Sequence, residues 1–506
     1  MAALDKNTQV AVIGAGAMGA GIAQVAAQAG HSVLLFDTRD GAAAQAIVGI
    51  DRQLGRLVEK GRLAASEHSA IRARLHAADS LAGLADAGLV IEAIVENLEV
   101  KRGLLRELES VCTASCILAS NTSSLSITSL AAGLQHPERV IGLHFFNPAP
   151  LMALVEVVSG LATAPALADA LYATARAWGK QPVHTRSTPG FIVNRVARPF
   201  YAESLRLLQE GAADCATLDA LLREAGGFRM GAFELTDLIG HDVNYAVTCS
   251  VFEAYYGDMR FQPSLLQKEL VDAGHLGRKS GRGFYDYSDG ALRPTASQAP
   301  GAPSIEGCVV EGELGIAEPL VERLQQAGVV VTRRAGAGLI RVGDAVLALS
   351  DGRLASQRAR QDGISGLVLF DLALDYAKAE RLAISRAART SEAALQQAIG
   401  LLQRAGLKVS LIEDTPALVV LRTVAMLANE GADALLHGVA SAADIDLAMC
   451  AGVNYPRGPL AWADAIGPAQ ILRTLENLQA AYGETRYRPS LLLRRRTEQG
   501  STLHAA

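Results

Sequence analysis

A histidine and a glutamate lie twelve residues apart in two apolar segments of this chain. His144 follows the apolar run 140–143, and Glu156 interrupts the run 154–158. An unpaired charge in a buried strand is costly, so we expect Glu156 to have a partner, and His144 is the nearest imidazole along the chain. An imidazole held in one tautomer by a carboxylate is suited to act as a general base. The pair therefore indicates a site for proton removal.

A glycine-rich turn near the N-terminus has the pattern of a dinucleotide-binding loop. It follows an apolar run, 9–13, and it leads into a helical run through the residues Gly14, Gly16, Ala17, Met18 and Gly19. Glycines allow a tight turn, close approach of the backbone to a pyrophosphate and close helix packing, while the first N–H groups of the helix face the phosphate. A merely structural tight turn is the alternative.

The strand that follows this helix ends in an acidic residue. The run 32–36 leads to Asp37, at the spacing from the last glycine of the loop that is expected of a ribose-binding acid. A carboxylate here accepts hydrogen bonds from a ribose 2′-hydroxyl and repels a 2′-phosphate. We expect NAD as the cofactor rather than NADP, although the neighbouring Arg39 weakens that preference.

Strand-like and helical segments alternate over the first third of the chain. Further apolar runs occupy 89–94, 116–120, 140–143 and 154–158. This alternation predicts a parallel, doubly wound sheet. The polar segment 120–124, which contains Asn121 and Ser123, follows one of these strands at the edge where such sheets bind ligands. The same residues also suit the N-cap of a following helix.

Five motifs in order resemble the L-3-hydroxyacyl-CoA dehydrogenase family. They are 12–21, 95–101, 120–125, 142–148 and 188–195, and the likeness extends from about residue 9 to residue 287. The resemblance implies an α/β Rossmann-type NAD domain followed by an all-α domain like that of 6-phosphogluconate dehydrogenase. It also implies NAD-dependent oxidation of (3S)-3-hydroxyacyl-CoA to 3-oxoacyl-CoA, a reaction that requires no metal ion.

The resemblance assigns roles to individual residues. His144 is implied to be the catalytic base, Glu156 its orienting partner, and Ser123 and Asn194 the groups that hold the substrate oxygens. The residues implied to line the NAD site, besides the glycine loop and Asp37, are Glu96, Lys101, Asn121, Ser123 and Lys279. Lys60 is implied to help bind coenzyme A, although a solvated cation at a helix C-terminus is the alternative.

The length of the chain bears on its substrate. The chain is a long form of the family with a duplicated helical part, and it is similar to the bacterial enzymes of phenylacetate breakdown that oxidise 3-hydroxyadipyl-CoA. Short-chain 3-hydroxybutyryl-CoA enzymes are the close alternative. An adipyl chain has a distal carboxylate, which an arginine binds well. Arg198, one helical turn beyond Asn194, and Arg229, at a turn, are the candidates. A structural salt bridge is the alternative role for each.

The second half of the chain repeats part of the first. Thr415–Pro416 matches Thr188–Pro189, and the offset between these two dipeptides also aligns Arg195 with Arg422. Such self-similarity at one constant offset indicates a duplicated domain. We predict an NAD domain at 1–186, a helical substrate and dimerisation domain at 187–290, a linker at 291–304, a reduced Rossmann-like domain at 305–410 and a degenerate helical repeat at 411–506.

The repeat is expected to lack chemistry. Asn194 aligns with Leu421, and the second half contains no GxGxxG. We expect neither His144 nor Glu156 to have a counterpart there, so that one active site serves the whole chain. The second helical copy is expected to pack on the first as an internal pseudo-dimer, or the protein forms a homodimer.

Composition excludes several classes of protein. The 506 residues are 50% apolar and 20% charged, with a net charge of −5, which indicates several globular domains and no nucleic-acid partner. Six cysteines without a CxxC argue against a disulfide framework or a zinc site. No apolar run reaches about 18 residues, so we expect a cytoplasmic protein with no membrane partner.

Two functions of other classes compete with the enzyme. A non-catalytic NAD-binding protein is disfavoured because the four residues of the expected catalytic set, Ser123, His144, Glu156 and Asn194, are intact. One half of a bifunctional hydratase and dehydrogenase is disfavoured because no domain is expected ahead of residue 9.

Overall fold

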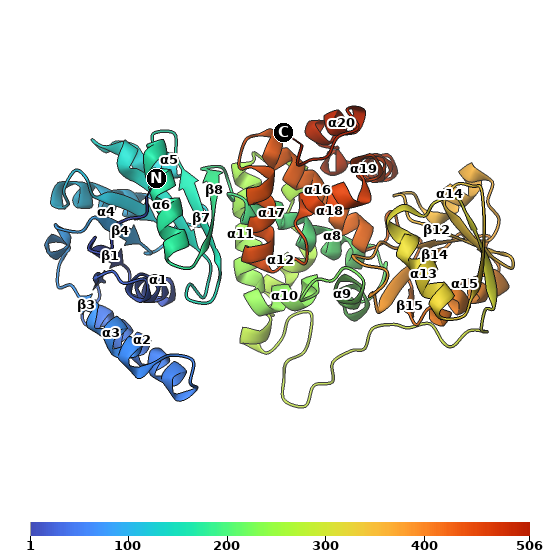
Figure 1. Cartoon of the computed structure of the whole chain (residues 1–506), viewed down its shortest axis with the longest axis horizontal. Coiled ribbons are helices and arrows are strands. Elements are labelled where there is room, and N and C mark those ends of the chain that lie inside the picture. The colour runs from blue at the N-terminus through green and yellow to red at the C-terminus, as the bar shows by residue number, and fades with distance from the viewer. Residues whose placement is uncertain (1, 506) are drawn as a thin grey trace. The chain divides into compact units, whose positions relative to one another are not determined.

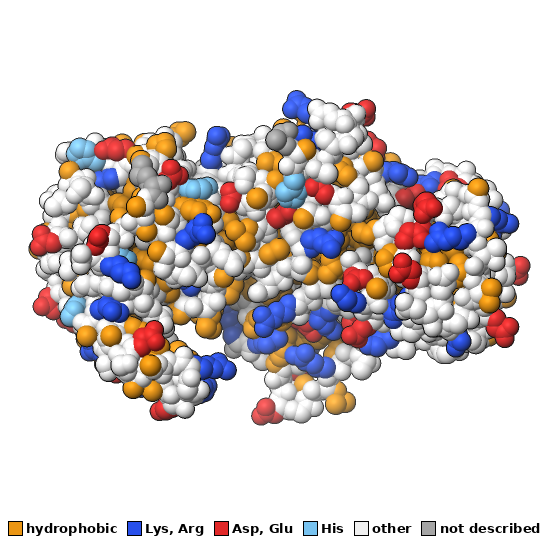
Figure 2. Space-filling model, in the orientation of Figure 1, with side chains coloured by type: hydrophobic (Ala, Val, Ile, Leu, Met, Phe, Trp, Pro, Cys, Tyr) orange, Lys and Arg blue, Asp and Glu red, His pale blue; other side chains and the backbone are white. Residues whose placement is uncertain are grey.

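The computed structural model describes residues 2–505 and separates into two compact units (Figure 1). The first unit contains the residues up to Arg195 together with His437–Val453, and the second contains Val196–Leu436 and the residues from Asn454 onward. Within the described residues, no helix combines the length and apolar character needed to cross a bilayer. Acidic and basic side chains both occur across the face drawn in Figure 2.

The first unit is built on an eight-stranded sheet in the order β3-β2-β1-β4-β5-β6-β7-β8. Its strands are β1 (Val10–Ile13), β2 (Val33–Phe36), β3 (Leu75–Ala77), β4 (Leu89–Glu92), β5 (Ile117–Ser120), β6 (Val140–Phe145), β7 (Leu154–Ser159) and β8 (Gln181–Arg186). The central strands are mostly apolar and fully buried, as expected for a sheet covered on both faces.

Helices cover both faces of this sheet (Figure 1). They include α1 (Ala17–Gln28), α4 (Leu98–Val111), α5 (Ile127–Ala131) and α6 (Pro165–Ala177), with 3-10 turns at Leu81–Leu84 and Pro137–Arg139. Helices α2 (Ala42–Glu59) and α3 (Ala65–Ala73) pack on each other and contact the sheet at its edge strand β3. Helix α2 is amphipathic, because Ile47, Ile50 and Leu54 are buried along one face. The predicted Rossmann-type α/β domain is therefore confirmed.

The expectation of an entirely parallel sheet was wrong at its last two strands, because β8 runs parallel to β7 and both run opposite to the other six. Strand β7 runs antiparallel to β6, with His144 directly opposite Glu156. The link between the two strands, 146–153, is shorter than the dozen or so residues that a parallel crossover needs, so the chain turns back on itself. The reversal brings the two residues into one cross-strand pair.

The second unit begins with the helices of the first helical copy. They are α8 (Arg198–Gln209), α9 (Cys215–Glu224), α10 (Ala232–Ile239), α11 (His241–Ala254) and α12 (Leu265–Asp272), with 3-10 turns at Met259–Phe261 and Arg278–Ser280; the four-residue α7 (Val193–Val196) precedes them. The predicted linker, 291–304, has no regular secondary structure.

A second, smaller sheet follows in the order β10-β9-β11-β12-β13-β14-β15. Its strands are β9 (Gly307–Glu311), β10 (Val330–Arg334), β11 (Leu339–Val342), β12 (Ala345–Leu349), β13 (Leu367–Phe370), β14 (Arg381–Arg386) and β15 (Lys408–Leu411). Its helices are α13 (Glu318–Gln326), α14 (Ala355–Asp362) and α15 (Glu392–Arg404), with a 3-10 turn at Gly315–Ala317. This mixed sheet is the reduced Rossmann-like domain expected from the sequence.

The second helical copy returns to the same unit. Its helices there are α16 (Val420–Leu436), α18 (Pro459–Ile466), α19 (Pro468–Tyr482) and α20 (Leu491–Glu498), with a 3-10 turn at Thr485–Tyr487. Gly240 separates α10 from α11 at φ +99°, and Gly467 separates α18 from α19 at φ +101°. The left-handed region favours glycine at both corners, so the repeat extends to backbone conformation.

One helix of the second copy packs apart from the others. Helix α17 (Ala442–Val453) belongs to the first unit and lies against β7 and β8. Gly452 allows the close approach, because a Cβ there would come within 2.5 Å of the Leu154 side chain. The sequence had placed the whole of 411–506 in one repeat, without indicating that this helix would leave it.

Candidate active site

The predicted pair between His144 and Glu156 forms. The Nδ1 atom of His144 lies 2.6 Å from Oε2 of Glu156, and both side chains are buried, at 6% and 1% exposure. The ring centres of Phe146 and Phe191 lie 4.5 and 5.9 Å from the centre of the imidazole. Because a carboxylate accepts a hydrogen bond, Nδ1 carries the proton and Nε2 keeps a free lone pair.

Glu156 also holds the start of α7. Its other oxygen, Oε1, accepts hydrogen bonds from the backbone N–H groups of Ile192 at 3.0 Å and Val193 at 3.1 Å. These are N–H groups that a helix start leaves without an intrahelical partner. A single carboxylate thus orients the imidazole and anchors the segment that carries Asn194.

The two residues predicted to hold the substrate oxygens lie close together. The Nδ2 atom of Asn194 donates to the backbone carbonyl of Ser123 at 3.4 Å. Ser123 follows β5, and Asn194 lies in α7, the helix start that Glu156 caps. The loop after β5 and the start of α7 therefore meet at the carboxyl edge of the sheet, where ligands of such folds bind.

The three glycines of the N-terminal loop have three different requirements. Gly14 has φ +99°, and a Cβ there would lie 2.6 Å from the carbonyl oxygen of Ala93. A Cβ on Gly19 would lie 1.7 Å from the carbonyl oxygen of Gly14, whereas one on Gly16 would meet nothing within 4 Å. Gly14 and Gly19 are needed for the turn and for packing, and Gly16 leaves a clear approach for a ligand.

The start of α1 completes a phosphate site. Ala17 and Met18 are the first two residues of the helix, so their N–H groups have no intrahelical partner. Together with the open face at Gly16, they fit the pyrophosphate of a dinucleotide. The loop and helix start therefore have the shape that NAD requires.

Asp37 lies at the end of β2, where the ribose acid was predicted. Its Oδ2 accepts the N–H of Ala15 at 2.7 Å, and Arg39 donates to both carboxylate oxygens. The hydrogen bonds from the Arg39 side chain, opposed by burial and aided by the Ala15 N–H, hold the pKa of Asp37 well below its usual value. The carboxylate is ionised, as an acceptor for a ribose hydroxyl must be.

Replacing Asp37 should change the cofactor preference. We expect Asp37→Ala to lower kcat/KM with NAD by about 10- to 100-fold, the loss of a charge-assisted hydrogen bond, and to raise kcat/KM with NADP because Arg39 is freed to meet a 2′-phosphate. Steady-state kinetics with both cofactors measure the ratio. An unchanged ratio would contradict this assignment, and Asp37→Ala/Arg39→Ala is the control that should reverse the gain with NADP.

Glu96 organises the loop after β5. Its Oε1 accepts hydrogen bonds from the Thr122 hydroxyl at 2.6 Å and from the N–H groups of Ser123 and Ser124 at 3.0 and 3.2 Å. Burial opposes ionisation of Glu96, but these donors and the Lys101 ammonium together lower its pKa. The predicted cofactor residues Glu96, Lys101 and Ser123 are thus brought together in one network.

A residue that the sequence analysis missed lies beneath this network. Glu92 ends β4 and is fully buried, and Lys101 Nζ donates to its two oxygens at 2.9 and 2.8 Å. The Ser120 hydroxyl donates to the same carboxylate. Like Glu156, Glu92 is an acid in an apolar run. Its position alone therefore predicts a buried partner, as the position of Glu156 predicted His144.

The remaining predicted residues are placed as follows. Asn121 accepts the N–H of Phe145 at 2.8 Å, which ties the loop to β6. Lys60 is exposed at the end of α2. Lys279 and Arg229 belong to the second unit, where Lys279 donates to Asp242 at 2.7 Å and Arg229 is exposed. Their ligand contacts stay predictions.

One expectation about the second half was wrong. Asp371 follows β13 and accepts the N–H groups of Val419, Val420 and Leu421 at 3.0, 2.7 and 3.0 Å. Val419 and Val420 align with Ile192 and Val193 at the offset of the repeat. Asp371 therefore has the anchoring role of Glu156, which survives because the helix start still needs a buried acceptor.

Family models match most of the chain. The model described as "3-hydroxyacyl-CoA dehydrogenase, NAD binding domain" matches residues 9–188, and that described as its "C-terminal domain" matches 190–287 and again 418–504. A third, described as "3-hydroxybutyryl-CoA dehydrogenase reduced Rossmann-fold domain", matches 347–416. The predicted order of a Rossmann domain, a helical domain, a reduced Rossmann domain and a second helical segment is thereby confirmed.

Named relatives agree with the family models. The chain is 47% identical over 487 residues to the 3-hydroxyadipyl-CoA dehydrogenase of Escherichia coli K12, an alignment that covers 96% of this chain and 97% of the relative. A crystal structure of 3-hydroxybutyryl-CoA dehydrogenase from E. coli K12 has a TM-score of 0.90 at 46% identity, covering 98% of this chain and 99% of the other. A probable 3-hydroxybutyryl-CoA dehydrogenase of Bacillus subtilis is 41% identical over 56% of this chain and 98% of its own length. The chain belongs to the 3-hydroxyacyl-CoA dehydrogenase family, whose members are NAD-dependent oxidoreductases.

Proposed function

We propose that this protein oxidises the 3-hydroxyl group of (3S)-3-hydroxyacyl-CoA with His144 as the base, and that 3-hydroxyadipyl-CoA is its principal substrate. The observation that carries the first part is the buried His144–Glu156 hydrogen bond of 2.6 Å. The adipyl substrate rests on the relative of that name, which aligns along nearly the full length of both chains.

The geometry supports a defined path for the proton. Nδ1 of His144 donates to Glu156, so Nε2 accepts the proton of the substrate hydroxyl, and the carboxylate stabilises the imidazolium that results. Asn194 and Ser123, which meet beside this pair, position the hydroxyl and the neighbouring thioester carbonyl. The Gly16 loop and Asp37 would hold NAD, which would take up the hydride released from C3, the carbon that carries the hydroxyl.

A substrate panel tests this function. Kinetics with (3S)-3-hydroxyacyl-CoA esters of several chain lengths, with NAD and with NADP, can be followed by the absorbance of the reduced nicotinamide. We expect turnover with NAD and the highest kcat/KM with the adipyl ester. The second candidate is 3-hydroxybutyryl-CoA, because the solved E. coli structure of TM-score 0.90 has that name; a preference for the butyryl ester would favour it, and no turnover of any ester would overturn both.

The duplicated helices support an internal pseudo-dimer. Arg260 of the first copy contacts Glu430 of the second at 3.1 Å, and Arg486 of the second copy contacts Glu203 of the first at 3.8 Å. Glu203 and Glu430 occupy equivalent positions at the offset of the repeat. Arg260 and Arg486 are also equivalent, at an offset one residue smaller, because the second copy has lost one residue before Pro489. The same contact made twice with the copies exchanged is typical of a two-fold interface.

Truncation should expose that interface. A chain ending near Tyr287 lacks the second copy and leaves the buried Glu203 without its partners Arg422 and Arg486. We expect sedimentation to show self-association or aggregation of this shortened chain, and a well-behaved monomer would contradict the pseudo-dimer.

The free cysteines support a reducing compartment, and we propose the cytoplasm.

A further inference from the structure

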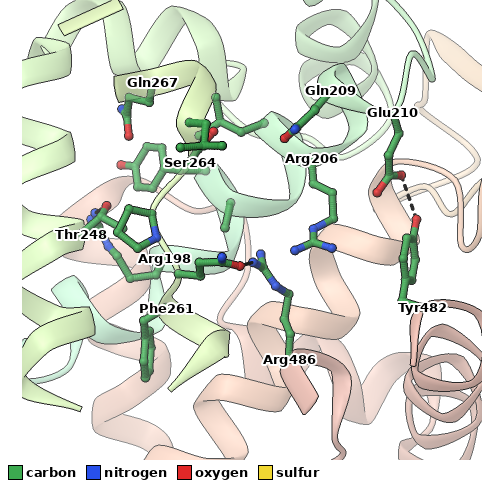
Figure 3. A pocket seen from close by; sticks show the side chains of 16 residues that line it. Arg198, Arg206, Gln209, Glu210, Thr248, Phe261, Ser264, Gln267, Tyr482 and Arg486 are labelled. Atoms are coloured by element: carbon green, nitrogen blue, oxygen red, sulfur yellow. Dashed lines mark hydrogen bonds between the residues drawn. The ribbon is translucent and has the colours of Figure 1, made fainter. Parts of the chain in front are cut away.

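A cavity of about 430 Å³ lies among the helices of the second unit, with three arginines in its lining (Figure 3). They are Arg198 and Arg206 of α8 and Arg486 of the second copy. The volume falls in the range of small-molecule sites. An anionic ligand group is the natural complement to such a lining.

Among residues 2–505, Arg198 is a buried cation without an acidic partner. It is 6% exposed, and its Nη1 donates to the Thr248 hydroxyl at 3.0 Å. Its Nε is buried with no acceptor, and its guanidinium lies 4.9 Å from the centre of the Tyr201 ring. Burial lowers the pKa of Arg198, and burying an unpaired cation is costly. A ligand carboxylate would supply the missing charge.

The other charges around the cavity are already paired. Arg206 donates to Glu484 at 2.9 Å, and Glu210, the acidic residue of the lining, accepts from Arg422 at 2.9 Å and from the Tyr482 hydroxyl at 2.8 Å. Arg486 donates to the Gln262 side chain at 3.1 Å and lies 3.6 Å from Glu484. Arg198 is therefore the cation that needs an incoming anion.

The polar lining is not required by the helical fold, because the second copy builds the same helices without it. Three polar residues have apolar counterparts there: Arg198 aligns with Ala425, Thr248 with Leu475 and Gln267 with Leu493. The first two pairs are separated by the same number of residues as Thr188 and Thr415. The third pair is separated by one residue fewer, because the second copy has lost one residue. The polar side chains occur in the copy that directly follows Asn194, which indicates a role in ligand binding.

We propose that this cavity binds the distal carboxylate of an ω-carboxyacyl chain, with Arg198 as the principal cation and Arg206 and Arg486 as further donors. The inference rests on the proposed function. Arg198 follows Asn194 by four residues, so the covalent chain alone keeps their Cα atoms within about 14 Å. An acyl chain whose 3-hydroxyl lies at Asn194 can then extend its far end toward Arg198.

The test compares two esters that differ at the far end of the chain. Full-length wild type and Arg198→Met are assayed on 3-hydroxyadipyl-CoA and on 3-hydroxyhexanoyl-CoA, which has the same length without the carboxylate. We expect the adipyl-to-hexanoyl ratio of kcat/KM to fall about 10- to 100-fold in the variant, the effect of losing a charged hydrogen-bond pair. Arg206→Met and Arg486→Met should lower it less, and Arg473→Met, an exposed arginine of α19, should not change it.

A stability measurement separates ligand binding from a structural role. Because Arg198→Met removes an unpaired buried charge, we expect its melting temperature to equal or exceed that of the wild type, whereas a lower one would show a structural cation and overturn the inference. Equal losses on both esters would also overturn it. A wild type that favours the hexanoyl ester would instead overturn the proposed substrate, so the two failures are distinguishable.

Discussion

The variant His144→Asn is expected to lower kcat by on the order of 10²- to 10⁴-fold, the usual contribution of a general base. The asparagine amide can still donate to Glu156, whose Oε2 lies 2.6 Å from Nδ1 of His144 in the wild type. It offers no acceptor in place of Nε2, so the proton of the substrate hydroxyl has no destination. The fold and the binding of substrate should be preserved.

Stopped-flow and steady-state kinetics on 3-hydroxyadipyl-CoA measure this loss. The binding of the 3-oxoacyl-CoA product, measured by calorimetry, is the control, because His144→Asn should change its Kd by only a few-fold. A kcat close to that of the wild type would contradict the assignment of His144 as the base.

The variant Glu156→Gln is expected to separate the two roles of the glutamate. The amide oxygen can still accept the N–H groups of Ile192 and Val193, which Oε1 accepts in the wild type. The amide nitrogen, however, would donate to Nδ1 of His144 and leave Nε2 protonated, which is the wrong tautomer for a base. We expect kcat to fall about 10²- to 10³-fold with only a small change in melting temperature.

Asp371→Asn is the matched control for this prediction. Asp371 anchors Val419–Leu421 as Glu156 anchors the start of α7, but it has no imidazole partner among its hydrogen bonds. Its amide would turn an NH2 group toward backbone donors, at a cost of about 1–3 kcal/mol for each unsatisfied group. We expect the variant to have a lower melting temperature, and an unchanged kcat when it is assayed below that temperature. Similar behaviour of the two variants would contradict the separate roles.

Local patterns predicted much of this architecture because their physical causes are local. The φ of +99° at Gly14 and the amphipathic face of α2 follow from short segments of sequence. The pairing of His144 with Glu156 was also predicted, since a buried acid needs a partner. The repeat was found because a Thr-Pro dipeptide and an arginine recur at one spacing.

Features that depend on distant parts of the chain were not predicted. Helix α17 leaves the helices of its own copy for the sheet of the first unit, and nothing within its twelve residues identifies that surface. One local feature was also missed: Glu92 and Lys101 are only nine residues apart, but the short apolar run that ends in Glu92 was taken as a plain strand. Asp371 follows an apolar run and aligns with His144 at the offset of the repeat, but its role was missed because its partners are backbone groups almost fifty residues away.

Isotopic labelling joins the cofactor site and the catalytic pair in one experiment. The wild type is supplied with NAD and with (3S)-3-hydroxyadipyl-CoA that has deuterium at C3, and the nicotinamide is recovered for mass spectrometry. We expect one deuterium in each reduced nicotinamide from the wild type and almost no reduction with His144→Asn at equal substrate occupancy. Unlabelled reduced nicotinamide, or an equal rate from His144→Asn, would contradict direct hydride transfer assisted by this histidine.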